Sequence, residues 1–241
     1  MTDFIDLHCH YLPAVDDGVR NLEDGVELCR ALGRIGYAQV AATPHIRSGM
    51  FPNQKADLVR RFEQFTTQAA GLTGMPKLLL GAEHFCDDVF FRLFEQGLTI
   101  PYAKSHSILI ELPPDNLPHG LGDAMFRLQL RGMLPVLAHP ERYATLFDST
   151  APIERLLEMG VVGLLDLMSL TGKYGRKPRR TAERMLEEGV YYAACSDCHK
   201  PADVDTVAKA IERLRELCGE DEAHALLAEH PSDILRGEVD R

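Results

Sequence analysis

The sequence lacks a hydrophobic run long enough to cross a membrane and lacks an excess of basic residues. No apolar stretch approaches the roughly 18 residues that a spanning helix needs, and Asp3 and Asp6 stand where a signal peptide would have a basic run. With 36 acidic and 26 basic side chains, the formal charge of −10 disfavours a nucleic acid as the main ligand, because neutralising phosphates needs a basic face. We therefore expect a cytoplasmic protein that neither inserts into membranes nor binds nucleic acid.

Cysteines are few and scattered. The six are Cys9, Cys29, Cys86, Cys195, Cys198 and Cys218. They lack the density of a disulfide framework, so we expect them to be reduced. The chain also lacks internal repeats and linkers rich in proline, glycine or serine. Its 241 residues can bury one large core, and we predict a single domain over residues 1–241.

Short apolar runs alternate with amphipathic stretches along the chain. The predicted strands are 4–8, 39–43, 77–82, 107–112, 134–138, 163–167 and 191–196. The predicted helices are 22–36, capped by Asn21, then 54–70, 89–96, 121–131, 153–159 and 177–188, and two over 204–228 broken at Gly219. Such alternation is typical of an α/β fold with parallel strands.

Side chains of the metal-ligand type follow six of the seven predicted strands. In chain order they are His8 and His10, His45, Glu83, Glu111, His139, and Asp197 with His199. In a parallel barrel the carboxyl ends of all strands point to one rim, so these side chains should converge. His8 and His10 are two residues apart on an extended segment and project to the same face, and Asp197 and His199 repeat the arrangement.

Asp17, in the loop after the first predicted strand, is a further candidate ligand, and its neighbour Asp16 competes for the role. The carboxylates gathered at this rim would be Asp17, Glu83, Glu111 and Asp197. They would repel one another unless cations neutralised them. Three divalent ions would neutralise the four carboxylates and leave about two positive charges in excess. That excess would attract phosphate. Imidazole together with carboxylate suits zinc, iron or manganese better than calcium.

Short motifs surround these residues. They are His-Cys-His at 8–10, Asp-Asp-Gly at 16–18, Thr-Pro-His at 43–45 followed by Arg47, Gly49 and Met50, Gly-Ala-Glu at 81–83, His-Pro-Glu-Arg-Tyr at 139–143, Ser-Leu-Thr-Gly at 169–172 and Ser-Asp-Cys-His at 196–199. Together they resemble the polymerase and histidinol phosphatase (PHP) superfamily, and more narrowly its bacterial capsular and exopolysaccharide tyrosine-phosphatase branch. The resemblance implies a distorted seven-stranded, TIM-like barrel that holds three metals, manganese or iron, with zinc as a further option.

The resemblance also implies roles for individual residues. His8, His10, Glu83 and Asp197 would surround one ion, Glu83 would bridge to a second held by Glu111 and His139, and Asp17, His45 and His199 would hold the third. Arg142 and Arg47 would contact the phosphate, and the ions would activate water for attack on phosphorus. The implied partner is the tyrosine-rich tail of an autophosphorylating kinase that controls polysaccharide export. The chain departs from the family where an arginine commonly follows the last histidine. Lys200 can take the place of that arginine, but its ammonium group cannot make the two parallel hydrogen bonds that a guanidinium makes to a phosphate.

Other hypotheses for the function are a small-molecule phosphatase of the histidinol phosphate type, a nuclease, which the acidic charge disfavours, and a non-enzymatic metal-binding module. Cys86 and Arg92 have the spacing of a cysteine-dependent phosphatase, but acidic and bulky residues between them oppose a phosphate-binding loop. His84 should point away from Glu83. The histidines expected to be exposed or structural are His106, His119, His224 and His230, of which His119 lies near enough to a strand end to approach the rim.

Overall fold

The computed structural model describes residues 3–102 and 105–239, and its strands form two parallel sheets. The first sheet has the order β1 (Phe4–Cys9), β2 (Tyr37–Ala42), β4 (Lys77–Leu80). The second has the order β3 (His45–Ile46), β5 (Glu83–Phe85), β6 (Ser107–Glu111), β7 (Leu134–Ala138), β8 (Val162–Asp166), β9 (Tyr191–Cys195). Every pairing within these sheets is parallel. The prediction of a parallel α/β fold is confirmed.

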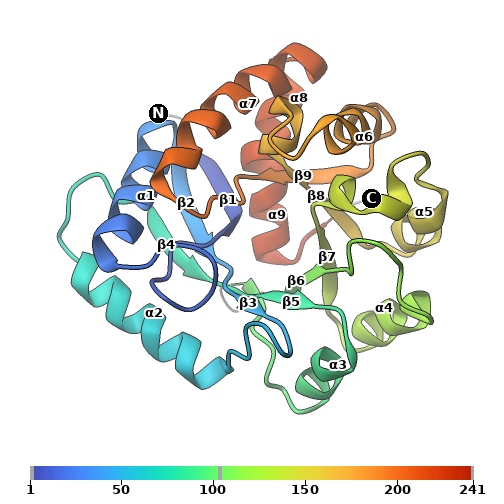
Figure 1. Ribbon diagram of the computed structural model, residues 1–241, viewed down its shortest axis with the longest axis horizontal. Helices are drawn as coiled ribbons and strands as arrows, with labels where there is room; N and C mark the ends of the chain where they lie inside the picture. The colour runs from blue at the N-terminus through green and yellow to red at the C-terminus, as the bar shows by residue number, and fades with distance from the viewer. Residues whose placement is uncertain (1–2, 103–104, 240–241) are drawn as a thin grey trace.

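Helices connect the strands and lie outside them. They are α1 (Leu22–Arg34), α2 (Lys55–Ala69), α3 (Asp88–Glu95), α4 (Leu121–Leu130), α5 (Ala151–Glu158), α6 (Arg176–Glu187), α7 (Val204–Cys218), α8 (Glu220–His224) and α9 (His230–Arg236), with a π-helical segment at Ala225–Glu229 and 3₁₀ segments at Pro140–Arg142, Ala144–Leu146, Leu167–Thr171 and Pro201–Asp203. In Figure 1 the strands surround the centre and α1 to α7 occupy the periphery. Within the described residues, no helix has the length and apolarity needed to span a bilayer.

The described residues form nine strands where seven were predicted, because the short strands β3 and β5 follow breaks after β2 and β4. β4 ends at Leu80, before the predicted limit at residue 82, and the separate strand β5 begins at Glu83, just beyond that limit. His45, which follows a predicted strand, begins β3. Pro44 supplies the physical reason for the break between β2 and β3, since it has no N–H to donate to a neighbouring strand. The Gly81 N–H still donates to the Ala42 carbonyl across the gap, at 2.8 Å.

The predicted helices are all present, with small shifts at their ends. The Asn21 side chain accepts a hydrogen bond from the Asp24 N–H at 2.8 Å and caps α1 as expected. α7 ends at Cys218, directly before Gly219, where the predicted break lies. The chain then remains helical as far as Arg236, beyond the predicted limit at residue 228.

The strands are buried on both faces, which explains their nearly continuous apolar sequences. In β6, Ile108 and Ile110 belong to the large outer cluster that includes buried helix residues, whereas Leu109 belongs to a smaller inner cluster. The inner cluster draws residues from β1, β2, β4, β6, β7, β8 and β9. Ile234 of α9 joins it, and its carbonyl accepts a hydrogen bond from Ser107 Oγ at the start of β6. Helix α9 therefore covers the amino ends of the strands and leaves the carboxyl ends accessible.

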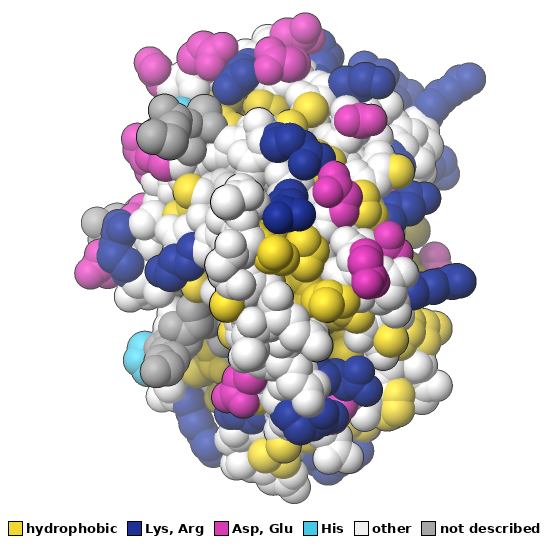
Figure 2. Space-filling model, turned by 90° about the vertical axis from the view of Figure 1, so that its left-hand side faces the viewer, with side chains coloured by type: hydrophobic (Ala, Val, Ile, Leu, Met, Phe, Trp, Pro, Cys, Tyr) yellow, Lys and Arg dark blue, Asp and Glu magenta, His cyan; other side chains and the backbone are white. Residues whose placement is uncertain are grey.

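The face at the left of Figure 1 is shown in Figure 2. On this face lysine and arginine side chains alternate with acidic ones around a hydrophobic area, and they do not form a continuous basic surface. Leu78 and Leu80 of β4 and Phe62 of α2 line an apolar pocket between these elements.

Replacement of Leu164 by alanine should test the inner cluster. The side chain is fully buried in β8, so Leu164→Ala should lower the free energy of unfolding by about 2–5 kcal/mol, measured from urea unfolding. Leu130→Ala is the matched control, because Leu130 on α4 is 70% exposed and should change the value by no more than about 0.5 kcal/mol. Equal losses in both variants would contradict the assignment of this core.

Candidate metal centre

Nine polar side chains meet at the carboxyl ends of the strands. They are the nine predicted from the sequence: His8, His10, Asp17, His45, Glu83, Glu111, His139, Asp197 and His199. The structure places their nitrogen and oxygen donors in four overlapping groups, each with its atoms within 4.8 Å of one another. The groups are His10, Asp17, His45 and His199; His8, His10 and Asp197; His8, Glu83 and His139; and His45, Glu83 and Glu111. The predicted convergence is therefore seen in the structure.

The way the structure groups these donors differs in two respects from the ligand sets that the family resemblance implies. His10 lies with Asp17, His45 and His199 as well as with His8 and Asp197. Glu111 lies with His45 and Glu83, whereas His139, its implied partner, lies with His8 and Glu83.

Backbone hydrogen bonds between the segments that end β1 and β9 align the pair His8 and His10 with the pair Asp197 and His199. The Asp197 N–H donates to the His8 carbonyl, and the His10 N–H donates to the Cys198 carbonyl, both at 2.9 Å. His8 Nε2 and His10 Nε2 each lie 3.3 Å from Asp197 Oδ1. His8 and His10 therefore project to the same side, as their spacing predicted.

Two residues of the centre have left-handed backbone conformations that side chains other than glycine rarely adopt. These are His139, with φ of 33°, and Asp197, with φ of 47°. Such strain persists only where the surrounding structure imposes it, and it is concentrated at functional sites. In both residues the conformation orients a buried side chain toward the centre.

Glu83 lies in the middle of the centre and is almost completely buried. Its Oε2 is 2.9 Å from His45 Nδ1 and 3.1 Å from His8 Nε2, and its Oε1 is 3.0 Å from His139 Nε2. The β3–β5 register pairs Glu83 directly with His45, so the short strands created by the break at Pro44 fix this contact.

Burial and charge oppose each other at these groups. Burial would raise the pKa of Glu83, but positive charge on His45 and His8 holds that pKa well below its usual range. Asp197 is similar, since burial would raise its pKa, but the charges of His8 and His199 together with neighbouring donors hold that pKa well below its usual range. Burial opposes protonation of His45, yet Glu83 together with Asp17 and Glu111 raises its pKa to about 11. Burial and the charge of Glu83 raise the pKa of Glu111 to about 7. The buried carboxylates are therefore stable as anions only with positive charge among them.

Several polar atoms of the centre are buried and have close neighbours of opposite charge, but none of these contacts within the described residues has the geometry of a hydrogen bond. They include Glu83 Oε2, Glu111 Oε2, Asp197 Oδ1 and His45 Nδ1. Leaving buried polar atoms unpaired is costly, and each of these belongs to a group of potential ligands. Carboxylate oxygens and imidazole nitrogens in this arrangement fit divalent manganese, iron or zinc.

Asp16 and Asp17 occupy different positions, which separates two candidates that the sequence left open. Asp17 Oδ1 lies 3.4 Å from both His45 Nε2 and His199 Nε2 and is a potential ligand. Asp16 instead orients its neighbours. Its Oδ2 is 2.9 Å from His10 Nδ1 and accepts a hydrogen bond from the His45 N–H at 3.1 Å. A carboxylate behind an imidazole fixes the orientation of the ring and its tautomer.

Arg142 lies beside the centre, where several contacts hold its guanidinium. Its Nη1 is 2.5 Å from Asp197 Oδ2 and 3.5 Å from Asp166 Oδ2, and Cζ lies 4.6 Å from the centroid of the Tyr174 ring. The sequence prediction missed Asp166 and Tyr174. Asp166 could have been found as the one charged residue at the end of an otherwise apolar strand, whereas nothing in the sequence singles out Tyr174.

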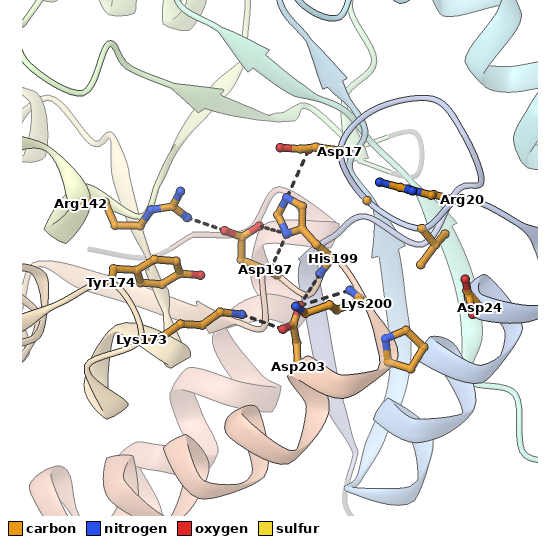
Figure 3. A pocket seen from close by; sticks show the side chains of 13 residues that line it. Asp17, Arg20, Asp24, Arg142, Lys173, Tyr174, Asp197, His199, Lys200 and Asp203 are labelled. Carbon is orange, nitrogen blue, oxygen red and sulfur yellow. Dashed lines mark hydrogen bonds and ion pairs between the residues drawn. The ribbon is translucent and has the colours of Figure 1, made fainter.

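A pocket of about 530 Å³ opens beside Asp17, Asp197 and His199, and Figure 3 shows its lining. Arg142 and Tyr174 form part of its wall, and Lys200 also lines it. Arg47 lies beside Glu111, with its guanidinium carbon 4.0 Å from the centroid of the Phe85 ring and its Nη1 4.0 Å from Glu111 Oε2. Both predicted phosphate contacts therefore flank the nine donors.

The remaining histidines lie outside the four ligand groups. His84 is buried, with Nδ1 3.1 Å from the Leu109 carbonyl, and its Nε2 accepts the Ile100 N–H, so its role is structural. His106 and His119 are exposed. His224 pairs with Asp3, and His230 Nδ1 is 2.8 Å from the Tyr192 carbonyl.

Cys86 does not have the environment of a nucleophile. The thiol is buried, and burial together with Asp87 raises its pKa to about 12. A catalytic cysteine needs a lowered pKa and access to substrate. Asp87 caps α3 through hydrogen bonds from the N–H groups of Val89 and Phe90 and would repel a phosphate.

Comparison with known proteins gives consistent matches over nearly the whole chain. A family model described as "Capsular polysaccharide synthesis, CpsB/CapC" matches residues 4–236. The tyrosine-protein phosphatase YwqE of Bacillus subtilis (strain 168) is 31% identical over 196 residues, which are 81% of this chain and 77% of the relative. The tyrosine-protein phosphatase CpsB of Streptococcus agalactiae serotype III (strain NEM316) is 27% identical over 242 residues, covering 96% of this chain and 98% of the relative.

Solved structures agree with these matches. A structure described as belonging to YwqE from B. subtilis and CpsB from Streptococcus pneumoniae, "unique metal-dependent tyrosine phosphatases", has a TM-score of 0.90 at 28% identity and covers 98% of this chain and 96% of its own. A prolidase complexed with N-methylphosphonate-L-proline has a TM-score of 0.59 at 13% identity and covers 99% of this chain and 75% of its own, which indicates a shared fold alone.

Gly18 provides a test of how tightly the aspartate loop packs against His10. A Cβ at this position would lie 2.3 Å from the His10 carbonyl oxygen and 2.6 Å from His10 Cβ. Gly18→Ala should therefore lower the free energy of unfolding by about 1–3 kcal/mol. Gly122→Ala in α4 is the control, since its Cβ would meet nothing within 4 Å and should add about 0.4–1 kcal/mol. A Gly18→Ala protein as stable in urea as the control would show that the contact is not tight.

Proposed function

This chain belongs to the CpsB/CapC family of capsular polysaccharide synthesis, and we propose that it is a metal-dependent tyrosine-protein phosphatase. The observation that supports this most directly is the meeting of nine metal-type donors beside Arg142. The relatives that match most of the chain are named tyrosine-protein phosphatases, and the structural neighbour is described as metal-dependent. Donor chemistry and family membership thus support the same reaction, hydrolysis of a phosphoric monoester.

Three divalent ions, manganese or iron with zinc as a further option, are part of the proposal. The proposed ligands are His8, His10, Asp17, His45, Glu83, Glu111, His139, Asp197 and His199. Nine donors for three ions leave coordination positions free, unlike a structural site closed by four ligands. This argues against the alternative of a non-enzymatic metal-binding module. When bound, such ions supply a lowered pKa for water and charge neutralisation for phosphate.

The side chains around the centre have separate roles in the proposal. Arg142 offers fixed N–H donors to the equatorial oxygens of the phosphate, where a phosphoryl transition state needs stabilisation. Its position is set by Asp197 and Asp166, so little reorganisation accompanies substrate binding. Arg47 contributes a second cation beside Glu111. Asp16 holds the imidazole of His10 in place.

We propose a phosphotyrosine protein as the substrate, and as partner the phosphorylated tyrosine-rich tail of a kinase that controls polysaccharide export. The name of the family supports capsule synthesis as the context. Because tyrosine phosphorylation consumes ATP, the proposed location is the cytoplasm. A small-molecule substrate such as histidinol phosphate is not favoured, since the matching relatives are named for phosphotyrosine proteins.

The two sheets are proposed to be parts of one distorted, seven-stranded TIM-like barrel of the PHP type in a single domain over residues 1–241. β3 would continue β2, and β5 would continue β4, which leaves seven strand positions. The inner cluster supports this because it collects residues from all seven. The hydrogen bonds between the ends of β1 and β9 support closure between the first and last strands.

Chelation is the first test of metal dependence. Treatment with a chelator should abolish turnover of para-nitrophenyl phosphate and of a phosphotyrosine peptide, and added Mn²⁺ should restore it, because the carboxylates alone cannot activate water or bind phosphate. The measurement is the release of phosphate, with metal content determined by elemental analysis in the same samples. Full activity in protein shown to be free of metal would end this proposal.

Substitutions should separate the proposed metal mechanism from a cysteine mechanism. His139→Ala and Asp197→Asn should each lower kcat by about 100-fold or more, as expected when a group that stabilises the transition state is lost. Cys86→Ser should retain kcat within about threefold of the parent protein, because its thiol is buried and protonated. Rates would be compared at equal folded protein, judged by circular dichroism. The reverse ranking would favour cysteine catalysis.

A further inference from the structure

The pocket beside the metal centre is larger than a site for phosphate alone. Its volume of about 530 Å³ equals that of a cube roughly 8 Å on a side. Figure 3 shows Arg142, Tyr174 and Lys173 along one wall and Arg20 with Asp24 along the opposite wall, with His199 and Lys200 between them. The pocket therefore extends from the proposed ligands Asp17, Asp197 and His199 toward a second set of charged side chains.

The cations of this pocket differ in how their charges are balanced. Arg142 pairs with Asp197, and Lys173 Nζ lies 2.8 Å from Asp203 Oδ1. Arg20 and Lys200 are exposed, and their side chains form no ion pair within the described part of the chain, although acidic residues outnumber basic ones by 36 to 26.

Asp24 is the remaining acidic group on that wall, and it has other partners. Its Oδ2 accepts a hydrogen bond from Asn21 Nδ2 at 2.9 Å, and it occupies the first turn of α1, where negative charge is favourable. Arg20 and Lys200 are thus the cations of this pocket for which the described residues provide no direct ion pair, although Asp24 lies on the same wall as Arg20.

The backbone that carries each of these cations is fixed against the metal centre. The Asp203 carboxylate accepts hydrogen bonds from the N–H groups of His199 and Lys200 at 3.0 and 3.2 Å. The Val19 N–H, next to Arg20, donates to the His10 carbonyl at 3.2 Å. Anchored positions reduce the entropy lost on binding, so the backbone from which each cation extends is held at a defined place relative to the site of hydrolysis.

We infer that Arg20 and Lys200 form a second anion-binding subsite, which takes a carboxylate or phosphate group that the substrate bears close to the phosphotyrosine. The inference rests on the proposed function and specifies its substrate as an acidic or multiply phosphorylated segment. An extended peptide advances about 3.3–3.6 Å per residue, so a side chain one to three residues from the phosphotyrosine reaches along this pocket. Lys200 is thereby assigned to a flanking anion, and Arg142 and Arg47 remain for the phosphate that is removed.

The test compares three phosphotyrosine peptides that differ only in the residues flanking the phosphotyrosine. The flanks are glutamine, glutamate, or a non-hydrolysable phosphonate analogue of phosphotyrosine. For the metal-loaded protein, kcat/KM with either anionic flank should exceed that with glutamine by about fivefold, the scale of partly exposed ion pairs, and the ratio should shrink in 0.5 M salt. Arg20→Gln and Lys200→Gln should each lower the ratio, and the double variant should bring it close to one.

The double variant Arg180→Gln with Lys209→Gln is the matched control. These cations are exposed on α6 and α7, and their loss changes the net charge by the same amount. The control should keep the preference for anionic flanks. Each ratio is taken within one protein, so differences in folded fraction cancel.

The outcomes separate this inference from the proposed function. A preference for glutamate or phosphonate that depends on Arg20 and Lys200 supports the subsite. The flank that gives the higher kcat/KM relative to glutamine identifies the anionic group that the subsite takes. Equal kcat/KM for all three peptides, or a preference that persists in the Arg20 and Lys200 double variant, overturns the subsite while phosphatase activity stands. Failure to hydrolyse any phosphotyrosine peptide overturns the proposed function itself.

Discussion

Buried carboxylates that face one another need positive charge between them, and this requirement organises the whole rim of the molecule. Glu83 and Asp197 are almost completely buried and each lies against several imidazoles. Their charges would be prohibitively unfavourable in such a place without histidinium or a metal cation nearby. The oxygens that lack a hydrogen bond of good geometry belong to these same carboxylates, the left-handed backbone at Asp197 turns one of them toward the imidazoles, and Asp16 holds the ring of His10.

The fold meets this requirement by bringing distant segments to one end of parallel strands. Helix α9 covers the opposite end, and the inner cluster fills the space between the strands, so the rim rests on a rigid base. The break at Pro44 adds a local adjustment, because the short strands that follow pair His45 directly with Glu83. The centre is thus assembled from packing and backbone hydrogen bonds as well as from its own charges.

Much of this centre could be predicted from the sequence, because histidines and carboxylates that directly follow apolar strands must share a rim in a parallel fold. Three features could not be predicted. The division of roles between Asp16 and Asp17 depends on the path of one loop, and the grouping of Glu111 with His45 depends on the strand register. The contact of Arg142 with Tyr174 joins segments that no sequence pattern relates.

The most direct test of the account is an anomalous diffraction map from crystals of the protein grown with Mn²⁺ and measured at energies above and below the manganese absorption edge. The account predicts strong anomalous peaks within bonding distance of Glu83 Oε2 and Asp197 Oδ1. The contradicting result is a well-ordered centre with no anomalous peak, in which these oxygens are paired with protonated His8, His10 and His45 alone.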